Sequence, residues 1–164
     1  MNFEMRLVEG SELAVVRSLA YDIWPRVYDY MISQEQINYM LPLMYDLNKL
    51  KEQCVAGVKF VLLEVEGIPQ GFVSFEEREE SIFLQKLYLR PEMHGRGLGK
   101  KMLQVVIDFA TDSKKVCIEL TVNRNNKSLE FYLDNGFQIK EEKDFDIGGG
   151  YFMNDYILSL PIIA

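Results

Sequence analysis

Two kinds of hydrophobic pattern run along the chain, and together they predict strands interspersed with helices. Alternating apolar and polar positions predict strands over Phe3–Val8, Lys59–Glu64, Gly71–Phe75, Ile82–Leu89, Val116–Val122, Phe137–Lys140 and Tyr151–Leu158. Apolar residues spaced three and four apart predict helices over Glu12–Tyr21, Arg26–Met31, Ser33–Leu41, Leu43–Gln53, Leu98–Thr111 and Lys127–Asn135. We therefore expect a single domain over residues 1–164.

Local chemistry predicts where several of these elements begin and end. Ser11 is expected to cap the first helix, and Ser33 with Gln36 three positions later has the form of a capping box. Pro25 is expected to interrupt the first helix, since a proline disfavours helical geometry in the residue before it. Gly136 is expected to close the last helix, and Asp146–Gly150 to form a flexible loop.

The order of the elements predicts how the strands pair. The three strands between Lys59 and Leu89 are joined by short links, which predicts an antiparallel meander. The strand, helix and strand that follow one another between Ile82 and Val122 predict a crossover with parallel neighbours. The expected fold class is therefore α/β (α+β), with a mixed, mostly antiparallel twisted sheet of six to seven strands flanked by helices.

A glycine-rich stretch, His94-Gly95-Arg96-Gly97-Leu98-Gly99, joins a predicted strand to a predicted helix. The first N–H groups of a helix have no partner within it, and the helix dipole places partial positive charge there. Glycines let the backbone adopt positive φ and approach a ligand closely. This stretch is therefore predicted to bind an anion, and we expect a phosphate group.

Charge sharpens this prediction. The net charge of −7 argues against nucleic-acid binding, which relies on a broad basic surface. A local basic cluster nevertheless surrounds the glycine-rich stretch: Lys86, Arg90, Arg96, Lys100 and Lys101, opposed by Glu92. A merely solvated basic surface is the alternative. Cys54 and Cys117 have no paired or metal-like spacing, and no targeting or membrane-spanning segment is recognisable, so we expect a cytoplasmic protein without membrane contact.

Two familiar nucleotide-binding patterns do not fit. A Walker loop fails because His94 stands where its first glycine belongs and Lys101 where its Ser or Thr belongs. A dinucleotide fingerprint meets Lys100 or Met102 at the third glycine, although Glu119 falls near the place of a ribose-binding acid. The predicted antiparallel strands also argue against a doubly wound sheet.

Two motifs give the chain a resemblance to the GNAT superfamily of acetyl-CoA-dependent N-acetyltransferases. His94, Gly97 and Gly99 align with the family's Gln/Arg-x-x-Gly-x-Gly/Ala signature, with histidine in place of Gln or Arg. Asn125, followed seven residues later by Tyr132 and then by Asn135-Gly136-Phe137, matches a second signature. The resemblance covers essentially the whole chain. It implies a GNAT fold with an N-terminal strand and substrate-side helices over 1–56, a cofactor-binding core over 57–140 and a C-terminal strand region over 141–164.

The resemblance also implies acetyl-CoA as co-substrate, with no metal, and direct transfer to an amine. The pyrophosphate is expected on the loop His94, Gly95, Arg96, Gly97, Leu98, Gly99 and Lys100, and the pantetheine arm beside Leu87, Tyr88 and Leu89, with an N–H at or near Leu89 as oxyanion donor. Asn125 is expected to bond the cofactor arm, and Tyr132 to act as general acid toward the thiolate; a packed helix aromatic is the alternative for Tyr132.

The general base and the acceptor stay open at this stage. The family often uses a Glu on the strand before the loop, but Ile82–Leu89 contains no acid. The candidates are Glu76 or Glu77, Glu119, or a water molecule, and the carboxylates also fit exposed structural positions.

Trp24, Tyr28 and Tyr30 are candidates for acceptor binding, with helix packing as the alternative. The acidic charge favours a small cationic amine such as a polyamine or amino acid derivative. A protein lysine or N-terminal amine, and a non-catalytic CoA-binding regulator, are the alternatives, and a homodimer is one option for assembly.

Overall fold

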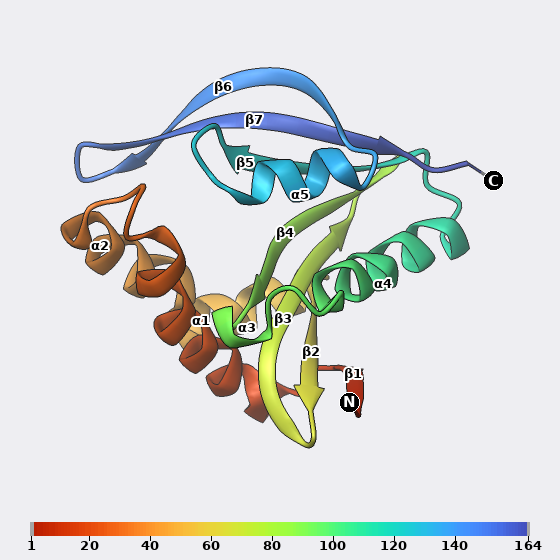
Figure 1. Cartoon of the computed structure of the whole chain (residues 1–164), viewed down its shortest axis with the longest axis horizontal. Helices are drawn as coiled ribbons and strands as arrows, with labels where there is room; N and C mark the ends of the chain where they lie inside the picture. The colour runs from red at the N-terminus through yellow and green to blue at the C-terminus, as the bar shows by residue number, and fades with distance from the viewer. Residues whose placement is uncertain (1, 164) are drawn as a thin grey trace.

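One seven-stranded sheet runs through residues 2–163, which are the residues that the computed structural model describes (Figure 1). The predicted ends of the domain, Met1 and Ala164, lie outside them. The strands are β1 Phe3–Leu7, β2 Lys59–Val65, β3 Ile68–Glu77, β4 Ser81–Leu89, β5 Cys117–Asn123, β6 Gln138–Gly148 and β7 Tyr151–Pro161. Their spatial order is β1-β2-β3-β4-β5-β7-β6, and among the described strands only β4 and β5 pair in parallel. The predicted meander, crossover and mixed sheet are confirmed.

Helices cover both faces of this sheet. They are α1 Leu13–Tyr28, α2 Gln34–Tyr45, α3 Leu47–Val55, α4 Leu98–Asp112 and α5 Ser128–Asp134, with short 3-10 turns at Gly10–Glu12 and Pro91–Met93. Figure 1 shows α1, α2 and α3 grouped on one side of β2–β4, with α4 on the other. Alternating side chains of β3 supply both cores: Phe72 packs with the α1–α3 cluster and Val73 with the α4 cluster.

The first helix differs from its prediction at both ends. The Gly10–Glu12 turn precedes it, with Glu9 and Glu12 forming the capping box, so Ser11 is not its cap. The helix then continues through Pro25 to Tyr28, and no separate Arg26–Met31 helix forms. Ile23 and Trp24, beside the proline, are 0% and 2% exposed, and the burial of such large apolar side chains outweighs the cost of one missing backbone hydrogen bond.

The second helix shows the same effect at another proline. Ser33 caps it as predicted by accepting a hydrogen bond from Gln36 N at 3.1 Å. It runs through Pro42 to Tyr45, four residues past the predicted end. The next helix begins at Leu47 because the Asp46 carboxylate accepts from Lys49 N at 3.1 Å and caps it.

The last two strands form a long hairpin that reaches α2. The predicted Asp146–Gly150 loop is mostly strand, because β6 extends to Gly148 and only a tight turn remains before Tyr151. Tyr39 of α2 donates to the Ile147 carbonyl at 3.1 Å, and its ring lies 5.2 Å from that of Tyr151. A Cβ at Gly148 would lie 2.7 Å from the Tyr39 hydroxyl, so the glycine permits this contact.

The sheet opens between β4 and β5. Their parallel ladder contains three residue pairs, from Ser81 opposite Cys117 to Phe83 opposite Glu119, and Figure 1 shows the two strands diverging beyond it. On its other side β4 carries a bulge at Gln85, since Ser74 pairs with Lys86 and Phe75 with Leu84.

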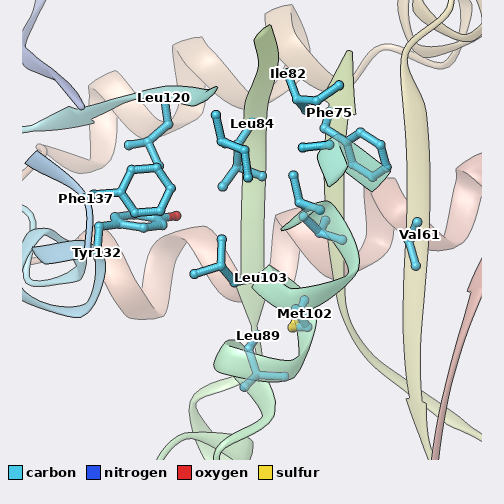
Figure 2. Close-up of a cluster of buried hydrophobic side chains, with 14 of the residues drawn as sticks. Val61, Phe75, Ile82, Leu84, Leu89, Met102, Leu103, Leu120, Tyr132 and Phe137 are labelled. Carbon is cyan, nitrogen blue, oxygen red and sulfur yellow. The ribbon is translucent and has the colours of Figure 1, made fainter. Parts of the chain in front are cut away.

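The bulge shifts the alternation of side chains on β4 by one position. Ile82 and Leu84, and then Leu87 and Leu89, face the α4 core, where Figure 2 shows Ile82, Leu84 and Leu89 among the buried side chains. Tyr88 consequently packs on the α1–α3 side. A strand without the extra residue would place Leu87 and Tyr88 on the opposite faces.

Candidate active site

A cavity of about 630 Å³ lies where the end of β4, the glycine-rich loop, the end of α1 and α5 meet. Its lining includes all but one residue of the predicted anion loop, together with apolar and aromatic side chains from the other three elements. The lining residues used below are Tyr28, Tyr30, Leu87, Tyr88, Leu89, His94, Gly95, Gly97, Leu98, Gly99, Lys100, Lys127, Ser128, Phe131 and Tyr132.

The end of β4 presents free main-chain groups to the gap between β4 and β5. Arg90 N donates to Gln70 O at 2.9 Å, and Leu89 lies opposite Gly71. Because the N–H groups along a strand alternate in direction, the main-chain groups of Leu87 and Leu89 point away from β3 and toward the gap. Gly71 allows this close pairing, since a Cβ there would lie 2.4 Å from the Tyr88 carbonyl oxygen.

The glycine-rich loop leads directly into α4. Gly95 and Gly97 have φ values of +79° and +76°, and a Cβ on either would meet no atom within 4 Å. The space above their backbone is therefore open to a ligand. His94, which stands at the family's Gln/Arg position, donates from Nε2 to the Leu89 carbonyl at 2.9 Å and so ties the loop to the end of β4. A helix of 15 residues begins at Leu98 with its N–H groups directed at this space.

The basic residues near the loop have different surroundings. Lys86 is 8% exposed on the α1–α3 side of the sheet, between the rings of Tyr45 and Phe60, and does not line the cavity. Arg90 pairs with Asp22 of α1 at 2.7 Å. Lys100 alone of these three lines the cavity.

Tyr132 lies on α5 and lines the cavity. Its ring packs against Phe131 and Phe137, with centroid distances of 5.3 and 5.5 Å, and the residue is 8% exposed. Figure 2 shows its hydroxyl pointing away from Phe137 toward β4, where Leu84 is labelled. Burial raises the pKa of Tyr132 well above its usual value, so the phenol keeps its proton at neutral pH.

Tyr28 and Tyr88 bring α1 and β4 together at the cavity. Their hydroxyl oxygens are 2.9 Å apart, and the rings meet edge to face at 6.1 Å. Burial raises the pKa of Tyr28 to about 12, although its hydrogen bonds to Tyr88 and Asn126 oppose the shift. Both phenols are therefore neutral hydrogen-bonding groups at physiological pH.

Asp155 of β7 is a buried acid that the sequence reasoning did not single out, and it does not line the cavity. It lies opposite Asn123, at the end of β5 that has separated from β4. The residue is 6% exposed, and its Oδ1 has no hydrogen-bond partner among the described residues. Burial raises its pKa to about 6, with Asp144 adding to the rise and Arg124 opposing it. A single acid in a largely apolar final strand was the available signal.

The other predicted site residues are scattered. Trp24 is 2% exposed within the α1–α3 core, whereas Tyr30 lines the cavity and its hydroxyl accepts a hydrogen bond from Lys127 N at 2.8 Å. Asn125 is exposed in the turn after β5 and does not line the cavity. The carboxylates proposed as bases, Glu76 and Glu119, lie outside it.

Both of these carboxylates already have partners. Glu119 pairs with Lys140 at 2.8 Å, and Glu76 pairs with Arg78 at 2.9 Å. Glu77, the third acid considered, pairs with Lys115 at 3.0 Å. None of the three lines the cavity that holds Tyr132.

Two broader features bear on the class of protein. Within residues 2–163, no helix combines the length and apolar character that crossing a membrane requires. The same residues contain no group of three or more His, Cys, Asp or Glu side chains arranged to hold a metal ion.

Sequence relatives fall into two groups. An uncharacterized N-acetyltransferase of Methanocaldococcus jannaschii is 32% identical over 90 residues, which cover 50% of this chain and 40% of that protein. The chain thus spans less than half of that relative. A spermidine N(1)-acetyltransferase of Thermoplasma acidophilum is 24% identical over 89% of this chain and 94% of its own length, and a spermine/spermidine N(1)-acetyltransferase of Bacillus subtilis is 29% identical over 80% and 91%.

Solved structures and a family model agree with the fold. The PaiA N-acetyltransferase of Thermoplasma acidophilum, in complex with coenzyme A, superposes with a TM-score of 0.83 at 23% identity, covering 98% of this chain and 99% of that one. A GCN5-related N-acetyltransferase of Rhodopseudomonas palustris gives a TM-score of 0.84 at 17% identity, covering 98% and 96%. The model of the acetyltransferase (GNAT) family matches residues 24–137, which is more than half of the sequence, and this chain belongs to that family.

Proposed function

We propose that this chain is an acetyl-CoA-dependent N-acetyltransferase that acts on small cationic amines by direct transfer. One observation carries the proposal: a single cavity is lined by the open glycine loop, by the end of β4 and by Tyr132. These three features supply an anion site, a surface for an extended arm and a proton donor. These three features correspond to the three parts of acetyl-CoA, which are the pyrophosphate, the pantetheine arm and the thioester.

The residues present fit coenzyme A. We assign the pyrophosphate to the backbone N–H groups from Gly95 to Lys100, because the space over Gly95 and Gly97 is open. We assign the pantetheine arm to the edge of β4 beside Leu87, Tyr88 and Leu89, where the main-chain groups of Leu87 could pair with its amides as a further strand would. Asn125, which aligns with the second motif, is exposed, so its hydrogen bond to the pantetheine arm stays a prediction.

Acetyl-CoA supplies the acetyl thioester, and the protein supplies the groups around it. Leu89 N–H points to the gap while its carbonyl is engaged by His94, so this N–H can donate to the carbonyl oxygen as negative charge develops there. The neutral Tyr132 phenol can give its proton to the departing thiolate. Attack by the amine forms the C–N bond and breaks the C–S bond, and the nitrogen releases the proton that restores Tyr132.

Three considerations favour a small cationic acceptor. Two relatives that align over most of their length are named as polyamine N-acetyltransferases. The chain carries a net charge of −7, which attracts cations. Tyr28 and Tyr30 line the end of the cavity that we assign to the acceptor, where the Tyr28 hydroxyl can meet an ammonium group; the Tyr30 ring already carries the Lys127 ammonium group at 4.4 Å, and Trp24 is enclosed in the core. A homodimer and a cytoplasmic location stay predictions.

The test is thiol release from acetyl-CoA in the presence of a panel of amines. The panel contains spermidine, spermine, a free amino acid amide and a peptide with a lysine and a free N-terminus. We expect steady release with the polyamines and mass-spectrometric detection of a mono-acetylated product. Release with the peptide alone would replace the small acceptor with a protein acceptor. Binding of acetyl-CoA by calorimetry without release for any amine would favour a non-catalytic coenzyme-binding role.

A further inference from the structure

We propose that Asp155 is the carboxylate that holds the ammonium group of the acceptor beside Tyr28 and takes up its proton. The inference rests on the proposed function and names the base that the sequence left open. It starts from one unusual observation. A carboxylate that is 6% exposed keeps an oxygen, Oδ1, without a hydrogen-bond partner in residues 2–163.

Buried carboxylates normally have a partner, because an unpaired buried charge is costly. The cation that acts on it is Arg124, which favours the charged carboxylate but directs its two terminal nitrogens to Glu142 and Asp144 of β6 and leaves its Nε without a hydrogen-bond partner among the described residues. Lys143 lies directly opposite Asp155 on β6, yet it is exposed and these two described residues form no ion pair. The structure therefore maintains a buried carboxylate oxygen to which no described side chain donates a hydrogen bond.

The position of Asp155 points to the acceptor side. It pairs with Asn123 at the end of β5, beyond the three-residue ladder that joins β5 to β4. Tyr151, four residues before it on the same face of β7, stacks on Tyr39 of α2, so this face is turned toward the helices that precede the core. Its charge also reaches Tyr28, since Asp155 is one cause of the raised pKa of that phenol.

Tyr28 connects this carboxylate to the cavity. Its hydroxyl bonds to Tyr88 of β4 and its side chain lines the cavity, while Tyr132 lies near enough that Tyr28 also contributes to raising its pKa. An amine held between Tyr28 and Asp155 would thus stand between the carboxylate and the thioester end of the cavity. The charged and titratable groups around Asp155 are Arg124 after β5, Lys143 and Asp144 on β6, and Tyr28 on α1.

The proton balance is complete with these groups. The ammonium gives one proton to Asp155 and becomes a nucleophilic amine, which forms the C–N bond as the C–S bond breaks. The thiolate takes a proton from Tyr132, and the second nitrogen proton restores that phenol. Asp155 then releases its proton to solvent, so one amide, one thiol and one proton result. A pKa near 6 suits this role, because the carboxylate is ionised at pH 7 and its conjugate acid is readily deprotonated.

The decisive experiment compares the pH profiles of kcat/KM for spermidine in the wild type and in Asp155→Asn. With an internal base, the wild type should be flat from about pH 7 to pH 9 and fall below about pH 6. Asp155→Asn should lose about a hundredfold at pH 7 and regain rate tenfold per pH unit, because it depends on free amine from solution. The control is Glu141→Gln, which removes an exposed carboxylate from the neighbouring strand β6 and should keep the wild-type profile.

The thermal stability of Asp155→Asn distinguishes a catalytic role of Asp155 from a structural one. The pKa of Asp155 is raised in the folded protein, so its charge opposes folding at pH 7, and Asp155→Asn should unfold at the same or a higher temperature while losing activity. Loss of both stability and acetyl-CoA binding in this variant would mean a structural role and overturn the proposal.

The wild-type profile decides the matter even if the variant does not fold. A wild-type kcat/KM that rises tenfold per pH unit from pH 6 to pH 9 would overturn the proposal. Absence of thiol release with every amine would overturn the proposed function and this inference together, whereas an active wild type with an unchanged Asp155→Asn profile would overturn the inference alone.

Discussion

The two walls of the cavity are built in different ways. The cofactor wall, which consists of Leu87–Leu89 and His94–Lys100, presents mainly backbone groups from one continuous part of the chain. The acceptor wall, which consists of Tyr28 and Tyr30 and which we extend to the proposed base Asp155 outside the cavity lining, takes side chains from the end of α1, the turn after it and β7, more than 120 residues apart. A backbone site needs only the right conformation, whereas a side-chain site also needs the tertiary fold that brings distant residues together.

The largest expected effect comes from damaging the cofactor wall alone. Gly97→Asp places a negative charge and a Cβ at a residue with φ +76°, so we expect acetyl-CoA affinity to fall by about 3 kcal/mol, or about two hundredfold. Calorimetry measures it. Gly67→Asp is the control, because Gly67 has φ +77° in the open turn between β2 and β3. Unchanged binding in Gly97→Asp would contradict the assignment of the loop.

Tyr132 lies where the two walls meet and should affect turnover without affecting either binding step. For Tyr132→Phe we expect kcat to fall by about a hundredfold, the lower end of the range for a proton-transfer group, with acetyl-CoA affinity retained. Steady-state kinetics and calorimetry check this together. Tyr45→Phe is the control, since Tyr45 is a fully buried tyrosine of the α1–α3 core. An unaltered kcat would remove Tyr132 from the mechanism.

Lys86 is buried outside both walls, so its substitution should change the stability of the fold rather than ligand binding. Burial lowers its pKa to about 8, so the folded protein holds the charged form less well than the unfolded chain does. Lys86→Met should raise the free energy of unfolding by about 2 kcal/mol at pH 7. This value allows for the favourable contacts of the Lys86 ammonium group with the Tyr45 and Phe60 rings, which the substitution also removes.

The stability gained by Lys86→Met should depend on pH in a defined direction. A depressed pKa means that wild-type stability rises between about pH 8 and the unfolded pKa of 10.5, so the advantage of Lys86→Met should shrink over this range. Urea unfolding at pH 7 and pH 10 measures it, with the exposed Lys51→Met as control. An advantage that grows with pH would show that Lys86 is not buried as a cation.

The smallest expected effect concerns the acceptor wall. Tyr28→Phe removes the hydrogen bond to the Tyr88 hydroxyl, and we expect KM for spermidine to rise about threefold while acetyl-CoA affinity stays unchanged. Kinetics at saturating acetyl-CoA measure it, with Tyr21→Phe on the exposed side of α1 as control. A larger change in coenzyme affinity than in KM would place Tyr28 on the cofactor wall instead.

The same contrast explains what could be predicted from the sequence. The loop and helix from His94 to Asp112 could be placed because glycines, a helix start and hydrophobic spacing are local signals. The continuation of α1 through Pro25 could not, since the burial of Ile23 and Trp24 that outweighs the proline is a property of the whole fold.

Side-chain sites were less predictable for a related reason. Asp155 had no motif around it, and the long-range pairing of β7 with β5 that brings it opposite Asn123 has no local signal in the sequence. The bulge at Gln85 was also hidden, because a sequence read in steps of two places Lys86 on the same face as Leu84. Glu76 and Glu119 were plausible by strand position, but the fold directs them to Arg78 and Lys140.

The short ladder between β4 and β5 also gives the sheet an edge in its interior. β4 keeps β3 as its partner as far as Leu89, but among the described strands none pairs with its other side over the six residues beyond Phe83. At the usual rise per residue this interior edge is about 20 Å long. An extended ligand can lie along it and complete the sheet from within, where both neighbouring strands protect it from solvent.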